Sequence, residues 1–167
     1  FIHQALQGIC YGDMLSTLLL RVRPYETIPG AANALYQYWS QKGIKYFNRA
    51  AKFSSYSAGY VMDDASGIVR TDEQQAEIDT FMAEYSEKAK ERRAIKSFRH
   101  LVDQTIDAFA SFPLQDIDRK PRVGVVGEIL VKFQPDANNH AIDVIESEGC
   151  EAVVPGLLDF FLYCTYN

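Results

Sequence analysis

Apolar residues recur every three or four positions in the first part of the chain, the spacing that aligns side chains on one face of a helix. This pattern runs through residues 1–23 and ends at Pro24. It returns in residues 31–47, with a weak point at Gly43. We therefore expect two helices, the first of them stopped by a proline that cannot continue it.

A longer helical pattern follows residues 54–70, a segment rich in Ser, Gly and Asp that is typical of a loop. Thr71 and Gln74 have the spacing of a capping box, in which each side chain satisfies the backbone N–H of the other residue. One apolar stripe then continues to Pro113, and a break between Lys90 and Arg93 is compatible with it. The stripe consists of Ile78, Phe81, Met82, Tyr85, Ile95, Phe98, Val102, Ile106 and Phe109.

The period changes after Pro113, where a polar linker leads into an apolar run at residues 122–127. A short run rich in β-branched residues is typical of a buried strand. Helical spacing follows, and Gly149 is well placed to end that helix in a left-handed conformation. Residues 150–155 predict a second strand, and residues 157–163 start a further helix.

These elements predict an α/β fold. A mainly helical portion, residues 1–115, precedes a Rossmann-like β-α-β unit with parallel strands, residues 116–167. The chain opens at Phe1 directly into a helical pattern and ends on the apolar stretch "FLYCTYN". Natural termini are more often polar and frayed. We therefore expect a fragment of a larger domain.

Composition narrows the classes of protein. The chain has 167 residues, of which 47% are hydrophobic and 23% charged, as in ordinary globular proteins. Its net charge of −5 argues against a nucleic-acid-binding protein, which normally carries a concentrated basic surface. No apolar run approaches the roughly 20 residues that cross a bilayer. The three cysteines have no C-x-x-C spacing, so a cytoplasmic protein without disulfides is expected.

The glycines after the first predicted strand do not form a nucleotide-binding loop. Gly124 and Gly127 give only a partial motif, whereas a dinucleotide fingerprint needs G-x-G-x-x-G and a P-loop needs G-x-x-x-x-G-K-[ST]. Glu128 follows at once, and its charge would repel a phosphate. Close packing or a bend at the end of the strand explains both glycines better.

Polar residues beyond this strand are candidates for ligand contact, because ligands of parallel sheets bind outside the carboxyl ends of the strands. Glu128 and Lys132 lie at this edge, and Asn138 and Asn139 lie near the start of the following helix. The alternative is ordinary helix capping by Asn together with a solvated Glu. The sequence leaves both interpretations open.

Two further groups have weaker candidate roles. Arg21 and Arg23 follow the end of the first helix, where guanidinium groups suit a carboxylate, a phosphate or coenzyme A, or simply favour the helix C-terminus.

Three histidines lie far apart and have no Ser or Cys partner that suggests a catalytic triad. An iron–sulfur cluster would require three distant thiols to converge, and no spacing motif supports this. The thiols are Cys10, Cys150 and Cys164.

Three stretches of the chain resemble a known family. "PRVGVVGEILVKFQPDANN" and "IESEGCEAVVPGLLDFFLY", residues 121–139 and 145–163, resemble a segment of the large bacterial activators of 2-hydroxyacyl-CoA dehydratases. "LQGICYGDMLSTLLLRVRPYE", residues 6–26, resembles an upstream segment of the same proteins. Residues 40–115 match only as a helical connection.

The resemblance implies a particular kind of parent protein. Such proteins combine ATPase activase modules of the actin/Hsp70-like kind with a region similar to the dehydratase subunits, where a Rossmann-like layout is expected. The activator hydrolyses ATP and passes an electron from a [4Fe–4S] cluster to the dehydratase, which removes water from a 2-hydroxyacyl-CoA by radical chemistry. This chain resembles the dehydratase-like region.

The chain also departs from that pattern. It has no ATPase phosphate motif, so we do not expect it to hydrolyse ATP by itself. A dehydratase subunit is expected to place a cluster-ligand cysteine close after the second strand, but residues 155–159 read Pro-Gly-Leu-Leu-Asp. Cys164 is the nearest thiol.

These observations lead to three hypotheses. The main one is a catalytically incomplete segment that binds an acyl-CoA or docks the electron-donating module, in contact with other domains of its parent protein. The second is a non-catalytic scaffold or protein-interaction module, which an exposed apolar patch would favour. The third is a redox module that carries an iron–sulfur cluster on the three cysteines.

Overall fold

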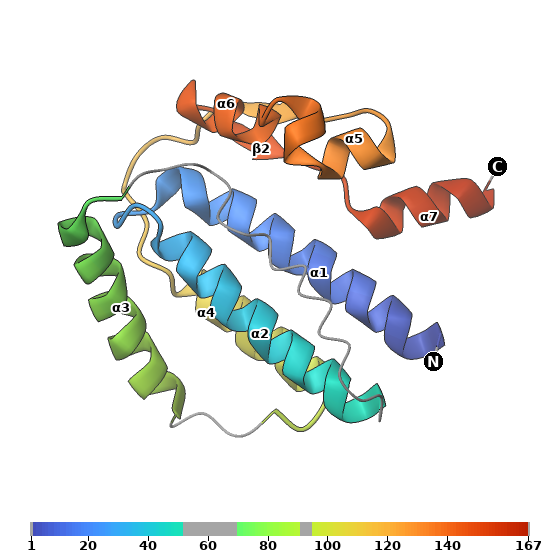
Figure 1. The fold of residues 1–167 in the computed structure, drawn as a ribbon, viewed down its shortest axis with the longest axis horizontal. Helices are drawn as coiled ribbons and strands as arrows, with labels where there is room; N and C mark the ends of the chain where they lie inside the picture. Colours follow the sequence, from blue (N-terminus) through green and yellow to red (C-terminus); the bar gives the residue numbers. More distant parts are fainter. Residues whose placement is uncertain (1, 52–69, 91–94, 167) are drawn as a thin grey trace.

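The computed structural model describes residues 2–51, 70–90 and 95–166. The predicted loop at residues 54–70 lies almost entirely outside these ranges, as does most of the break predicted at Lys90 to Arg93. The helical portion contains α1 (Ile2–Val22), the short 3-10 helix η1 (Arg23–Tyr25), α2 (Ala31–Ala51), α3 (Asp72–Lys90) and α4 (Phe98–Ala110). Helices α1, α2 and α4 lie side by side, and α3 lies against α2 (Figure 1).

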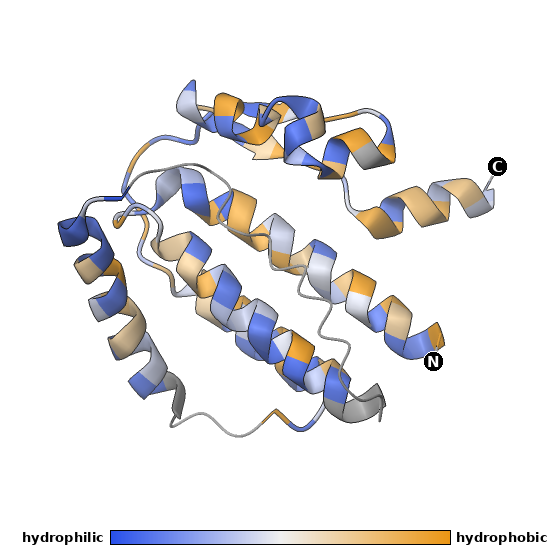
Figure 2. Cartoon of the chain, viewed as in Figure 1, coloured by the Kyte–Doolittle hydropathy of each residue, from blue (hydrophilic) through white to orange (hydrophobic). Residues whose placement is uncertain are grey.

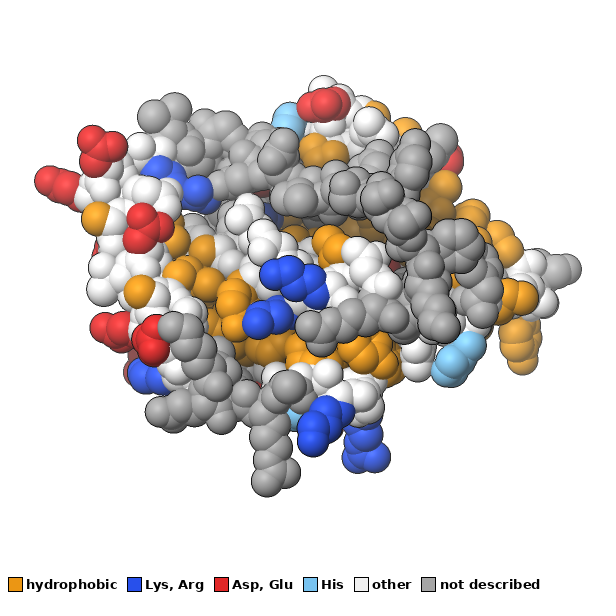
Figure 3. Space-filling model, turned by 60° about the horizontal axis from the view of Figure 1, so that its bottom comes forward, with side chains coloured by type: hydrophobic (Ala, Val, Ile, Leu, Met, Phe, Trp, Pro, Cys, Tyr) orange, Lys and Arg blue, Asp and Glu red, His pale blue; other side chains and the backbone are white. Residues whose placement is uncertain are grey.

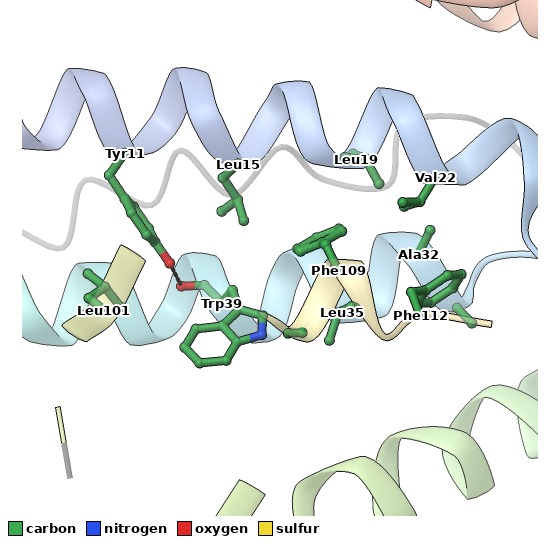
Figure 4. Packing of buried hydrophobic residues seen from close by; sticks show 12 residues of the cluster. Tyr11, Leu15, Leu19, Val22, Ala32, Leu35, Trp39, Leu101, Phe109 and Phe112 are labelled. Atoms are coloured by element: carbon green, nitrogen blue, oxygen red, sulfur yellow. Dashed lines mark hydrogen bonds between the residues drawn. The ribbon is translucent and has the colours of Figure 1, made fainter. Parts of the chain in front are cut away.

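The core lies between α1, α2 and α4, which contribute one buried face each (Figure 4). Tyr11 is 4% exposed, yet it carries a hydroxyl that must find partners in this apolar setting. The hydroxyl donates to the Trp39 carbonyl at 2.9 Å and lies 3.1 Å from Thr105 Oγ1. The cluster therefore combines apolar packing with a satisfied polar link. Its buried residues are Tyr11, Leu15, Leu19, Val22, Ala31, Ala32, Leu35, Trp39, Leu101, Ala108, Phe109 and Phe112.

Several local predictions are confirmed. The first helix ends at Val22, and Pro24 lies in the short 3-10 helix that follows. The capping box precedes α3: Gln74 N–H donates to Thr71 Oγ1 at 3.3 Å, and Thr71 N–H donates to Gln74 Oε1 at 3.1 Å. Gly43 does not interrupt α2. A Cβ at Gly43 would overlap the Tyr11 ring, so this glycine permits α1 and α2 to approach closely.

The second part of the chain forms a small parallel sheet with a helical crossover. Its elements are β1 (Arg122–Gly124), α5 (Ile129–Phe133), the 3-10 helix η2 (Pro135–Asn138), α6 (Ala141–Ser147), β2 (Glu151–Val153) and α7 (Leu157–Tyr166). The two strands pair in parallel, with Arg122 opposite Glu151 and Gly124 opposite Val153. Gly149 has φ of +78°, the left-handed conformation predicted for the residue that ends the crossover helix. The described residues are thus mostly helical, with a two-stranded parallel sheet.

The prediction of a buried strand at residues 122–127 is wrong in two respects. Strand β1 covers Arg122–Gly124 alone, and all three residues are exposed. Val123 is 38% exposed, and Val126, beyond the strand, is 82% exposed. The physical reason is that α1 and α6 pack chiefly against β2, whereas the side chains of a buried parallel strand are covered by helices on the faces of the sheet.

Helix α1 joins the two parts of the molecule, because it packs against β2 and α7 as well as against α2 and α4. Asp13 on α1 accepts hydrogen bonds from the Leu157 and Leu158 N–H groups at 2.9 and 2.7 Å. It therefore caps α7 from a distant part of the sequence. Gly156 is required at this contact, because a Cβ there would lie 2.7 Å from Asp13 Oδ2.

The surface is unevenly divided between charge and apolar area. Helix α3 carries acidic residues along its outer face, and they gather at the left of the view in Figure 3, beside apolar side chains. Helix α7 is apolar along nearly its whole length (Figure 2). Its aromatic residues are also exposed.

Candidate functional site

The polar residues predicted to lie beyond the first strand cluster around α5 and η2, where two of them cap helices. Glu128 Oε2 accepts the Val131 N–H at 3.2 Å, at the start of α5. Asn138 Oδ1 accepts the Ala141 N–H at 3.1 Å, and its Nδ2 donates to the Val131 carbonyl at 2.9 Å. These two side chains therefore shape the turn between the crossover helices. Their role as ligand contacts stays a prediction.

Lys132 differs from its polar neighbours, because the residue is only 9% exposed. Its ammonium group lies 4.8 Å from the centre of the Phe133 ring, a distance at which a cation is attracted to an aromatic face. No carboxylate among the described residues forms an ion pair with Lys132. A cation held in this way has capacity left for an anionic group.

Asn139 occupies the sharp turn between η2 and α6. Asn139 and His140 have φ of 55° and 53°, and Asn is among the residues that tolerate the left-handed region best. His140 lies 3.5 Å from Asp136 and 3.4 Å from Asp143. The position of Asn139 is thus explained by backbone conformation.

Arg23 is placed in a different cluster, between the two parts of the molecule. Its Nε donates to Glu146 Oε2 of α6 at 2.8 Å, and the two side chains are 17% and 16% exposed. Asp143 lies 4.0 Å from the same guanidinium. Arg23 is therefore engaged in an internal ion pair, which joins η1 to α6. Arg21 is exposed on the last turn of α1.

Glu146 and Glu26 are two partly buried carboxylates near Arg23, and burial disfavours their charged forms. Burial raises the pKa of Glu146 above its usual value, and Arg23 offsets this only in part. Burial also raises the pKa of Glu26, although its oxygens accept the Gly30 and Ala32 N–H groups at 2.6 and 2.9 Å. Glu146 Oε1 is buried and has no hydrogen-bond partner within the described ranges. The cluster thus holds more negative charge than Arg23 alone neutralises.

The structure also contains a buried carboxylate that our sequence interpretation missed. Glu151 is 1% exposed, accepts a hydrogen bond from Tyr25 Oη at 3.1 Å, and lies 3.1 Å from Arg122 Nε. Arg119 Nε is 3.6 Å away. Among the residues that the structure describes, the Oε1 atom near Arg122 has no partner with hydrogen-bond geometry. A charged residue inside the apolar run "CEAVVP" was the signal that could have revealed it.

The candidate residues therefore belong to two separate groups. Glu128, Lys132, Asn138 and Asn139 surround α5 and η2, whereas Arg23 is ion-paired to α6. The structure brings together the first four residues and leaves the arginines outside them.

The cysteines do not converge. Cys10 and Cys150 are partly buried on α1 and before β2, and Cys164 is exposed on α7. All three are free thiols. Within residues 2–51, 70–90 and 95–166, no three His, Cys, Asp or Glu side chains are grouped so that they could hold a metal ion. The hypothesis of an iron–sulfur cluster on these three thiols stays a prediction.

None of the helices in the described ranges combines the length and the apolar character needed to cross a membrane. Comparisons with protein-family models, with curated proteins and with solved structures find no match to this chain.

Proposed function

We propose that this chain is the dehydratase-like segment of a 2-hydroxyacyl-CoA dehydratase activator-type protein, and that it docks another domain of that protein. The sequence resemblance at residues 6–26, 121–139 and 145–163 supports this assignment. The parallel strands and helical crossover agree with the Rossmann-like layout expected for that region. The segment is catalytically incomplete on its own, and its parent supplies ATP hydrolysis and the iron–sulfur cluster.

The exposure of α7 carries this proposal. Phe161 is 46% exposed, Leu162 57%, Tyr163 68% and Tyr166 96%. The helix has one charged residue, Asp159, so its surface is unusually apolar for a helix in water. Exposed apolar and aromatic clusters of this kind mark surfaces that bind other proteins. Figure 3 shows apolar side chains at the right-hand end of the molecule, where α7 and the start of α1 lie.

The docking partner that fits best is the electron-donating ATPase module. A purified module of this kind should bind the chain, and Phe161→Ser should weaken binding about 10-fold or more, as truncation of an aromatic interface anchor does. Val144→Ser is the matched control, because Val144 is 53% exposed on α6, away from α7. Equal affinities of wild type and both variants, or no binding at all, would contradict the proposal.

A second candidate function is binding of an acyl-CoA, and Lys132 is the observation that favours it. Its ammonium has an aromatic neighbour but no ion-paired carboxylate among the described residues, which suits a phosphate or carboxylate. Calorimetry with coenzyme A should show binding that Lys132→Ala abolishes. Arg23→Ala should change the affinity little, because Arg23 is already paired with Glu146. An absence of heat with wild type would end this candidate.

A further inference from the structure

We propose that β1 and the residues that follow it, residues 122–128, pair along their open edge with the same segment of a second copy of this chain, antiparallel across a two-fold axis. This interaction lies on a different surface from α7 and is independent of the docking function proposed above.

The backbone of β1 has hydrogen-bonding groups directed away from β2. Glu151 N–H donates to the Pro121 carbonyl, and Val125 N–H donates to the Val153 carbonyl, both at 2.8 Å. Residues 121 and 125 thus face β2, and the period-two alternation of a strand directs Arg122 and Gly124 to the other side. Within the described residues, β1 pairs only with β2.

An open edge of this kind is a template for another strand. Its side chains are exposed as well, since Val123 is 38% exposed and Val126 is 82% exposed. The run from Val123 to Gly127 has no charge that would repel an approaching strand. The edge is short, however, so charge must help to select its partner and register.

Charge along this segment favours a second copy. Arg122 precedes the uncharged run and Glu128 follows it, and both residues are exposed. An antiparallel pair centred on Val125 places Arg122 of each copy opposite Glu128 of the other. Arg122 also contacts Glu151 of its own chain through Nε, but its side chain is 48% exposed, so two ion pairs between the copies can form beside that contact. In the same register, the main-chain groups of Gly124 exchange hydrogen bonds with Val126 of the second copy. The contact is self-complementary, as a two-fold interface requires.

The register makes a geometric prediction. Val125 lies on the two-fold axis as a non-hydrogen-bonded pair, in which the Cα atoms of an antiparallel ladder are about 4.5 Å apart. That separation is within the range that a disulfide spans. Val123 instead lies opposite Gly127 of the second copy. In a chain with Cys10, Cys150 and Cys164 changed to Ser, Val125→Cys should form a disulfide-linked dimer on mild oxidation, and Val123→Cys should not.

Sedimentation of the chain over a range of concentrations provides the main test, and wild type should show a dimer that weakens at high salt. Glu128→Gln keeps an acceptor for the Val131 N–H but removes both ion pairs. It should weaken the dimer about 2- to 30-fold, given the usual strength of cross-strand charge pairs. Glu84→Gln, at an exposed position on α3, removes the same charge and should leave the dimer unchanged.

Each outcome decides the proposal. A wild-type chain that stays monomeric at every concentration overturns it. A dimer that Glu128→Gln leaves unchanged, or that is cross-linked through residue 123 and not 125, overturns the charge-paired register. A dimer with the expected response to both substitutions supports it.

Discussion

Glu146 is a carboxylate that the fold holds against a single guanidinium, and its pKa is raised mainly by burial. The folded protein therefore binds protons at this site more tightly than the unfolded chain, whose usual value is 4.5. The stability associated with the protonated group is complete below the unfolded pKa and is lost as the pH rises through the folded pKa. Burial also raises the pKa of Glu26, so its contribution to stability changes with pH in the same direction.

We predict that wild type gains stability relative to Glu146→Gln as the pH is lowered from 7 toward 5. The neutral amide does not titrate, so the difference isolates this group from the other charges around it, which are Arg23, Lys120, Asp143 and Glu26. Urea unfolding of both proteins at several pH values provides the measurement. A difference that stays constant, or that changes in the opposite direction, would show that Glu146 has no raised pKa.

Removing the cation at this cluster should destabilise the fold. Arg23→Ala leaves the Glu146 carboxylate, which is 16% exposed, without its hydrogen-bonded partner. We expect a loss of about 1–3 kcal/mol of unfolding free energy at pH 7, the usual cost of a buried polar group left unsatisfied. The loss should shrink in the double variant with Glu146→Gln. An equal loss in both backgrounds would mean that the ion pair contributes nothing specific.

Tyr11 tests the polar link inside the helical core. Burial raises the pKa of Tyr11 to about 12, and its hydroxyl contacts the Trp39 carbonyl and Thr105. Tyr11→Phe should reduce the free energy of unfolding by about 1 kcal/mol, because Thr105 retains its own bond to the Leu101 carbonyl. Tyr163→Phe, at a residue that is 68% exposed, should have no effect in the same urea titration.

At this scale, the sequence predicts local interactions better than distant ones. Thr71 and Gln74 are three positions apart, so their reciprocal caps follow from spacing alone. Glu151 and Tyr25 are separated by 126 positions, and nothing in the spacing of either residue indicates their hydrogen bond. The same reason explains why Arg23 could be singled out, but not its partner on α6.

At the scale of elements, α7 depends on a cap supplied by another helix. Asp13 on α1 accepts the first N–H groups of α7, at Leu157 and Leu158. We predict that Asp13→Ala leaves α1 and α2 folded but loosens α7, at a cost of about 0.5–2 kcal/mol, as for other N-cap losses. Amide hydrogen exchange along residues 157–166 provides the measurement. Unchanged protection there would show that apolar packing on α1 alone holds the helix.

A second variant disturbs the cap on α7 without removing the carboxylate of Asp13. Gly156→Ala keeps Asp13 but introduces a methyl group where a Cβ would lie 2.7 Å from its carboxylate. It should loosen α7 in the same way. Asp159 accepts the Gly156 N–H at 3.2 Å, so Asp159→Ala shows how much a cap from within α7 contributes to the same protection.

The sequence pattern predicted where most elements lie, but not how they are covered. Period and turn residues locate β1, β2 and the crossover, because these signals are local. Burial of a strand depends on what lies beside it, and an apolar run such as residues 122–127 does not carry that information. Val126 belongs to the apolar run, as the sequence shows, but it is exposed and not buried as we predicted. The same limit applies to α7, whose apolar positions indicate a helix but not its exposure.

For the whole molecule, the links between the two parts are numerous and chemically different. Asp13 ties α1 to α7, Arg23 ties η1 to α6, and Tyr25 ties η1 to β2. An antiparallel bridge also joins Glu26 to Leu114, at the start of the linker. A two-stranded sheet is marginal when it stands alone. The β-α-β unit therefore depends for its stability on the helical part, and on α1 above all.

We predict that the two parts unfold together. Amides of β2, such as that of Ala152, and amides of α4, such as that of Leu101, should exchange with the same opening free energy, because both residues are buried in the joined structure. Glu151→Ala removes the carboxylate that Tyr25, Arg119 and Arg122 share, and it should lower protection at Ala152 first. The loss should be about 1–3 kcal/mol at that amide, the usual cost of leaving a buried polar group such as the Tyr25 hydroxyl without its partner, because Arg119 and Arg122 remain largely exposed. If native-state exchange instead gives two different opening energies in wild type, the sheet unfolds on its own and these links do not make the molecule one cooperative unit.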